Sequence, residues 1–109
     1  MTDQRYNGWT NYETWYVKLW MDNDEGSYNY YREVAEATYQ ETESEYDWQT
    51  KEDAAKYRLS EILKDEYGEM NPLGDVANTF SDLLGAALSS VNWYEIAEHF
   101  IDDAMEDAA

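Results

Sequence analysis

Apolar and aromatic residues recur along most of the chain at the three- and four-residue spacing of a helix. The first such pattern, within residues 10–22, occupies positions i, i+3, i+4, i+7 and i+8: Tyr12, Trp15, Tyr16, Leu19 and Trp20. This pattern predicts a helix that buries its aromatic face and ends near Asp22. Thr10, followed three residues later by Glu13, fits a capping box, which predicts Thr10 as the N-cap.

A polar break that contains Gly26 precedes a second helical pattern, with Ser27 as its predicted N-cap. Its inner face is expected to comprise Tyr28, Tyr31, Val34, Ala35, Thr38 and Tyr39. A short turn between two amphipathic helices favours an antiparallel pair. Residues 40–50 are the least regular part of the chain, and their acidic sequence predicts either a loop or the end of this helix.

Thr50, with Asp53 three residues later, predicts the start of a third helix. Its apolar stripe comprises Ala55, Leu59, Ile62, Leu63 and Tyr67. Gly68 occupies the position typical of a glycine just after a helix, and Pro72 follows shortly. The third helix is therefore expected to stop at Gly68.

The most aliphatic pattern of the chain follows the segment Leu73-Gly74-Asp75 and predicts a fourth helix at the centre of the core. Its apolar positions are Val76, Phe80, Leu83, Leu84, Ala87, Leu88 and Val91. Asn92 and Glu95 resemble a second capping box, after which a fifth helix runs to about Glu106. The inner face of that helix is expected to comprise Trp93, Ile96, Ala97, Phe100, Ile101 and Ala104.

Together these patterns predict an all-α fold, a compact bundle of about five short amphipathic helices. The 109 residues fit one domain, residues 1–109, which begins with a polar tail at residues 1–8. Leu, Ile and Val total only 14, so the 18 aromatic residues must supply much of the buried area.

Charge is the main guide to function. The chain carries 25 acidic and 7 basic residues, a formal net charge of −18, and no Lys or Arg follows Lys64. A chain without a basic patch cannot displace counterions from phosphates, so direct binding to nucleic acid or to an anionic membrane is not expected. The expected partner is a basic, nucleic-acid-binding protein. The competing interpretation is that the acidic surface serves solubility or hydration at high salt.

Acidic residues form a line on the predicted fifth helix at steps of three and four residues. These are Glu95, Glu98, Asp102 and Glu106, with Asp103 beside them. Carboxylates one helical turn apart are spaced on the scale of phosphates along a nucleic acid strand, so the line can face Arg and Lys side chains. The second helix and the acidic segment after it extend the candidate partner-binding surface: Glu33, Glu36, Glu41, Glu43, Glu45 and Asp47.

Catalytic and metal chemistry find little support in the sequence. His99 is the single histidine, and no nucleophile is tied to it by spacing, so an enzyme using His99 is the weakest alternative. Asp22, Asp24 and Glu33 fit three positions of an EF-hand loop, but Gly26 is one position early, and a turn before a capped helix explains them better. We expect no catalytic residue, no metal and no cofactor.

Two motifs stand out: residues 7–15, NGWTNYETW, continued by Leu19-Trp20 and residues 22–26, and residues 91–97, VNWYEIA. Through them the chain resembles a family of small acidic proteins of unknown function encoded by phages and mobile elements. This resemblance implies a genomic setting and not a mechanism. Small acidic proteins from that setting are similar in style to anti-CRISPR and antirestriction proteins, several of which imitate DNA.

We therefore expect an inhibitor of a host defence nucleoprotein, a CRISPR effector or a restriction enzyme, that occupies its basic nucleic-acid channel by DNA mimicry. The alternative is an acidic structural or replication accessory protein of a phage or plasmid. No long apolar run and no signal peptide pattern are present, so a soluble protein of the host cytoplasm is expected. The oligomeric state stays open, with a dimer as one alternative.

Overall fold

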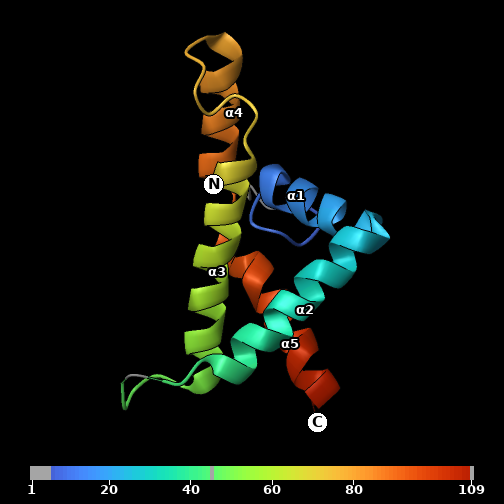
Figure 1. Ribbon diagram of the computed structural model, residues 1–109, viewed down its shortest axis with the longest axis vertical. Helices are drawn as coiled ribbons and strands as arrows, with labels where there is room; N and C mark the ends of the chain where they lie inside the picture. Colours follow the sequence, from blue (N-terminus) through green and yellow to red (C-terminus); the bar gives the residue numbers. More distant parts are fainter. Residues whose placement is uncertain (1–5, 45, 109) are drawn as a thin grey trace.

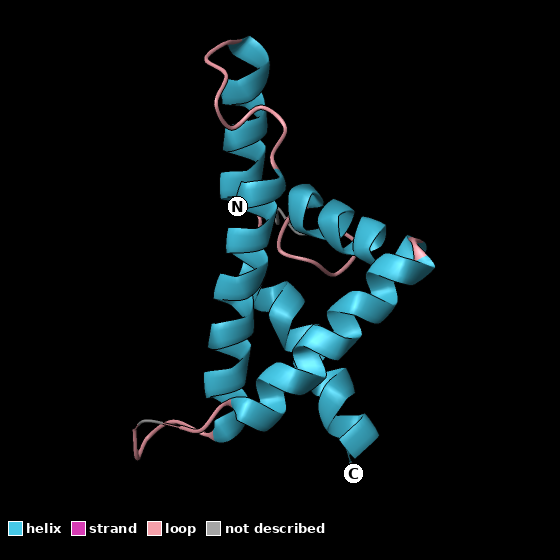
Figure 2. Ribbon diagram, viewed as in Figure 1, coloured by secondary structure: helices cyan, strands magenta, loops and turns pink. Residues whose placement is uncertain are grey.

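The computed structural model describes residues 6–44 and 46–108, which form five helices joined by turns and loops (Figure 1, Figure 2). In chain order the helices are α1 (Tyr12–Asn23), α2 (Glu25–Glu41), α3 (Lys51–Met70), α4 (Thr79–Ser90) and α5 (Trp93–Ala108). The described residues contain no strand. The predicted all-α bundle of about five short amphipathic helices is therefore confirmed.

The core is built around α5, against which α2 and α3 pack. Figure 1 shows α2 crossing α5. The predicted inner face of α5 is confirmed, since all of its members are buried: Trp93, Ile96, Ala97, Phe100, Ile101 and Ala104. The predicted inner faces of α2 and α3 supply the facing residues: Tyr31, Ala35, Ala55, Leu59 and Leu63.

The predicted buried face of α1 is wrong. Its aromatic row is exposed to solvent: Tyr12, Tyr16 and Trp20. Thr14 and Met21 are buried instead, and Val17 packs against the core. These three residues follow one another at i, i+3 and i+7, so they also share one side of the helix. Because both sides of α1 carry large apolar groups, periodicity alone selects the wrong one.

The prediction that the fourth helix forms the centre of the core is also wrong. α4 contains no buried residue, and within the described chain α1 is the one helix against which it packs. Phe80 and Leu83 are 71% and 64% exposed. Figure 1 shows α4 projecting beyond the other helices at one end of the long axis. Only Leu88, near the end of α4, and Val91 after it reach the core.

Asparagine and aspartate cap the first two helices in place of the predicted hydroxyl residues. Asn11, and not Thr10, caps α1, since its side chain accepts a hydrogen bond from the third helical N–H. Asp24, and not Ser27, caps α2 in the same way. Both side chains carry an oxygen that reaches the N3 backbone. The predicted Thr50 cap of α3 is confirmed.

The α3–α4 connection also differs from its prediction. α3 continues past the expected stop at Gly68. Pro72 ends it, because a proline disfavours the helical conformation of the residue before it, and Asn71 is extended with φ −60° and ψ 112°. α4 begins later than predicted, where Asn78 and Ser81 form a reciprocal capping box.

The overall shape reflects the projecting helix. The radius of gyration is 15.1 Å, whereas a compact chain of this length has one of ~13 Å. The 42–50 loop projects at the opposite end from α4 (Figure 2). None of the helices in the described residues combines the length and apolar character needed to cross a membrane.

Candidate functional site

The two sequence motifs meet where the start of α1 lies against the α4–α5 turn. Thr14 Oγ1 donates to Asn11 Oδ1 at 2.6 Å and accepts the N–H of Asn92 at 2.8 Å. Asn92 Nδ2 donates to Thr10 Oγ1 at 3.0 Å. Asn11 Nδ2 donates to the carbonyl of Ser90 at 2.7 Å. We name this set of hydrogen bonds the cap junction, because Asn11 and Asn92 also cap α1 and α5.

Glu95 belongs to the cap junction and not to a free acidic surface. Its Oε1 accepts the N–H of Thr10 at 2.8 Å, and its own N–H donates to Asn92 Oδ1 at 3.1 Å. The capping box predicted between Asn92 and Glu95 therefore forms in one direction only, and the glutamate carboxylate binds the segment before α1. A carboxylate held in this way is less available to a partner.

Two further carboxylates of the predicted line share one lysine of α3. Lys56 Nζ lies 3.3 Å from Asp102 Oδ1 and 3.7 Å from Glu98 Oε2. Burial of Lys56 opposes its charged form, but the hydrogen bond to Asp102 and the charges of Asp102 and Glu98 outweigh burial and raise the pKa of Lys56. The sequence prediction missed Lys56, although its spacing to Leu59 and Leu63 places it on the buried stripe of α3.

Asp103 and Glu106 complete the outer side of α5, and both are exposed. We name Glu98, Asp102, Asp103 and Glu106 the α5 acidic surface. Lys56 offsets one negative charge among these four carboxylates, so the surface stays negative. Carboxylates one turn apart on this helix are about 5.4 Å apart along its axis.

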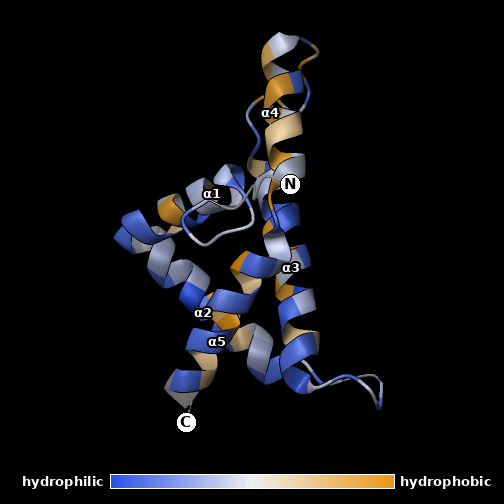
Figure 3. Ribbon diagram, turned by 180° about the vertical axis from the view of Figure 1, so that it is seen from behind, coloured by the Kyte–Doolittle hydropathy of each residue, from blue (hydrophilic) through white to orange (hydrophobic). Residues whose placement is uncertain are grey.

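The acidic residues of α2 and of the following loop form a separate patch. α2 ends at Glu41, and the rest of the predicted acidic segment is a loop. Glu36 pairs with Arg32 of the same helix at 3.6 Å, and the other described members are exposed: Glu33, Glu41, Glu43 and Asp47. Glu45 lies outside the described residues. Figure 3 shows this loop and the C-terminal end of α5 pointing away from each other, so the acids of the loop and those at the end of α5 lie apart.

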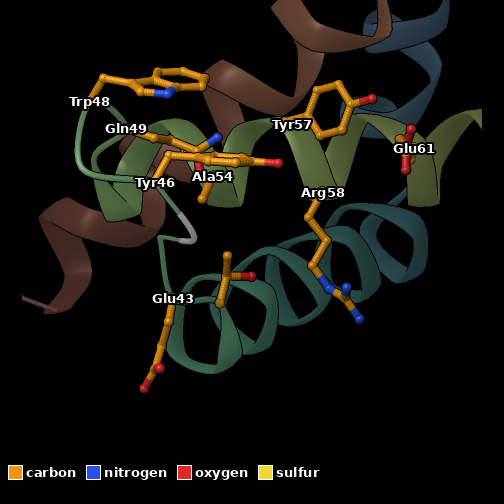
Figure 4. A pocket seen from close by; sticks show the side chains of 9 residues that line it. Glu43, Tyr46, Trp48, Gln49, Ala54, Tyr57, Arg58 and Glu61 are labelled. Atoms are coloured by element: carbon orange, nitrogen blue, oxygen red, sulfur yellow. The ribbon is translucent and has the colours of Figure 1, made fainter.

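An open pocket of about 520 Å³ lies between the 42–50 loop and α3 (Figure 4). Tyr46 and Trp48 stack with ring centroids 5.0 Å apart and an interplanar angle of 12°. Tyr57 and Arg58 of α3 line the pocket beside them. Such rings can hold a cationic side chain. The sequence did not predict this pocket, because it forms only where side chains of the loop lie beside α3.

A row of exposed rings also runs along α1. Tyr12 and Tyr16 stack with centroids 5.5 Å apart, and Trp20 meets Tyr16 edge-to-face at 6.2 Å. Rings that contact one another keep defined orientations, so less conformational entropy is lost when a partner covers them. This row is the reverse of the buried face that the sequence predicted.

His99 contacts an aromatic ring and not a nucleophile. Its ring lies 4.2 Å from that of Trp9, centroid to centroid, with an interplanar angle of 30°. Trp9 is placed by the tight turn at Asn7 and Gly8, which have positive φ values of 49° and 86°. Tyr6, Asn7 and Gly8 of the predicted polar tail thus belong to a turn, and residues 1–5 lie outside the described residues.

Fold and surface together define a small, strongly acidic, all-α protein with exposed carboxylates and exposed aromatic rings. A family model described as a family of unknown function (DUF7249) matches residues 2–108, and the chain belongs to this family. Comparison with the curated proteins and with the solved structures finds no match.

Proposed function

We propose that this protein inhibits a host defence nucleoprotein, of the anti-CRISPR or antirestriction type, by occupying its basic nucleic-acid channel as a DNA mimic. The observation that carries the proposal is the α5 acidic surface. Its four carboxylates stand on the outer side of the helix whose inner side forms the core. Because the core fixes that helix, the backbone positions from which the carboxylates extend are set before a partner arrives, which lowers the entropy lost on binding.

In this proposal the carboxylates replace phosphates. Arg and Lys side chains of the channel would bind Asp103 and Glu106 directly and would compete with Lys56 for Asp102. The net charge of −18 steers a basic partner toward the inhibitor and speeds their association. Exposed rings such as Trp48, 78% exposed in the loop, supply anchor contacts beside the charges.

The test is DNA cleavage by a panel of CRISPR effectors and restriction enzymes, each measured with and without the purified protein. We expect wild type to inhibit at least one of them. Changing Glu98, Asp102 and Glu106 together to Lys should weaken that inhibition by about tenfold or more, because attraction becomes repulsion. A second variant, Asp103→Lys with Glu106→Lys, leaves both partners of Lys56 in place and should act in the same direction.

A charge-matched control separates the α5 surface from net charge. Glu69→Lys with Asp75→Lys makes the same charge change as Asp103→Lys with Glu106→Lys, on exposed residues near the α3–α4 connection, and should leave inhibition nearly intact. Inhibition should also fall as salt rises, since the Debye length shortens from about 10 Å at 0.1 M to about 3 Å at 1 M. If the triple variant folds and still inhibits fully, the α5 acidic surface is the wrong one.

The second candidate is a structural or replication accessory protein whose charge serves solvation. It is favoured by Glu95 and Glu98, which take part in contacts within the fold. Thermal unfolding across a salt series discriminates between the two. A melting temperature that keeps rising into molar salt, with no inhibition of any nuclease, favours salt adaptation.

A further inference from the structure

The open side of α4 is an apolar feature that the monomer leaves uncovered. Phe80 and Leu83 of the helix, with Val76 just before it, are 71%, 64% and 44% exposed. Phe80 and Leu83 are three residues apart and so share one side of the helix, and Val76 lies in the segment that leads into it. Figure 3 shows the hydrophobic colour recurring along α4. We name these three residues the α4 apolar face.

This helix lacks the packing that normally holds a short helix in place. An isolated helix of fewer than about 12–15 residues is marginal in water, and most helices are held by burial of their apolar side. α4 has 12 residues and is fixed at its ends, by the Asn78–Ser81 capping box and by Leu88 against the core. α1 packs against part of it, but the side that carries Phe80 and Leu83 has no cover within the described residues. A contiguous exposed apolar patch of this kind marks an interaction site.

Charge identifies which partner suits the face. Within α4 the only charged residue is Asp82, which lies on the opposite side of the helix from Phe80, and Asp75 precedes Val76. A basic partner is recognised through carboxylates, which the α4 apolar face does not offer. The same face on another copy is apolar, equally free of charge and complementary under a two-fold axis. We propose that the α4 apolar face binds its equivalent on a second copy of this chain.

The position of α4 limits the repulsion between two chains of charge −18, with the exposed Glu69 and Asp75 near the α3–α4 connection as the acids that stay closest. Figure 1 places the projecting end of α4 opposite the 42–50 loop and the C-terminal end of α5 along the longest dimension, 45 Å. The Debye length at 0.1 M salt is only about 10 Å. Two copies paired through α4 therefore keep their acidic patches beyond the range of strong repulsion and directed away from the interface.

The size of the contact sets its strength. A helix of this length is about 18 Å long, so the pair lies at the low end of stable interfaces. We therefore expect a weak dimer that dissociates in the micromolar range and forms as concentration rises.

Sedimentation equilibrium of the full chain across a micromolar concentration series tests the proposal. The mass should rise from the 12.9 kDa of one chain toward twice that value. Phe80→Glu should raise the dissociation constant at least about tenfold, and the neutral Phe80→Ser should act in the same direction. Trp48→Glu, which adds the same charge at an exposed ring at the other end of the molecule, is the matched control and should leave dimerisation unchanged.

Salt distinguishes this contact from one made by carboxylates. Dimerisation through an apolar face should strengthen as salt rises, because only the repulsion is screened. A wild-type chain that stays monomeric throughout would overturn the proposal and leave the face to another protein. Dimerisation that weakens with salt, or that Trp48→Glu disrupts as strongly as Phe80→Glu, would overturn it too. These measurements need no nuclease, so the dimer proposal can fail while the proposed inhibition holds, and the reverse.

Discussion

α4 and α5 have similar sequence patterns and opposite environments. Both follow an asparagine cap, Asn78 and Asn92, and both carry apolar residues at helical spacing. The inner side of α5 is covered by α2 and α3, whereas the row at Phe80 and Leu83 faces solvent. Periodicity therefore identifies residues that share a side of a helix, but it does not tell whether another element covers that side.

Side-chain contacts reinforce the difference. α5 is tied to the rest of the chain by Lys56, which reaches two of its carboxylates, and by Glu95, which accepts the Thr10 N–H. α4 is joined to the rest of the chain by the hydrogen bond from Asn11 to the carbonyl of Ser90, the last residue of α4. The first part of α4 is therefore held by its own backbone and cap.

The largest expected effect is on the free energy of unfolding, when a phenylalanine of α5 and one of α4 are each changed to alanine. Phe100→Ala should lower the free energy of unfolding by about 3–5 kcal/mol, because Phe100 is fully buried in the core. Phe80→Ala should change it by no more than about 0.5 kcal/mol, because that ring faces solvent in the monomer. Urea unfolding at a concentration too low for dimers measures both. Equal losses would show that the monomer covers α4 after all.

A smaller effect is expected at the cap junction, where α1 meets the turn between the two helices. Thr14→Val keeps the shape of this fully buried side chain but leaves the N–H of Asn92 without its partner, at a cost of about 1–3 kcal/mol. Thr14→Ser keeps the hydroxyl and loses one methyl group, about 0.8 kcal/mol. If Ser proved as damaging as Val in urea unfolding, the hydroxyl would not be the stabilising group.

The smallest expected effect is a loss of folding stability at alkaline pH, where tyrosines ionise. It concerns the core around α5 and not α4, because α4 contains no tyrosine. Burial, the charges of Tyr67 and Glu66 and a hydrogen bond to Tyr67 raise the pKa of Tyr31 above its ordinary value of 10.0. Burial also raises the pKa of Tyr67 and of Tyr94. A raised pKa favours the neutral phenol in the folded state, so its stabilisation is complete below pH 10 and is lost as the pH rises further.

Unfolding measured by circular dichroism above pH 10 checks this expectation. Tyr31→Phe removes one such phenol and should flatten the loss of stability with pH. An unchanged slope would mean that Tyr31 is solvated when folded. Lys56 acts in the same direction, because its pKa is raised from 10.5 and its stabilisation is lost above that value.

Much of the fold followed from the sequence because local rules were obeyed. The caps at Thr50 and Asn92 and the inner sides of α2, α3 and α5 were predicted correctly. The candidate site was predicted less completely. Asp103 and Glu106 are exposed as expected, but Glu95 is held at the cap junction and Glu98 shares Lys56. These differences arise from contacts between residues far apart in the chain, which spacing along one helix does not reveal.

The helical class, the acidic character and the residues that share a side of each helix could be read from the chain alone, because backbone hydrogen bonding and side-chain period are local. Only the tertiary structure decided that α1 buries Thr14 and Met21 in place of its aromatic row. It also decided that α4 keeps an open apolar face. The physical reason is that burial depends on which surfaces meet, and those surfaces come from separate segments brought together by the whole chain.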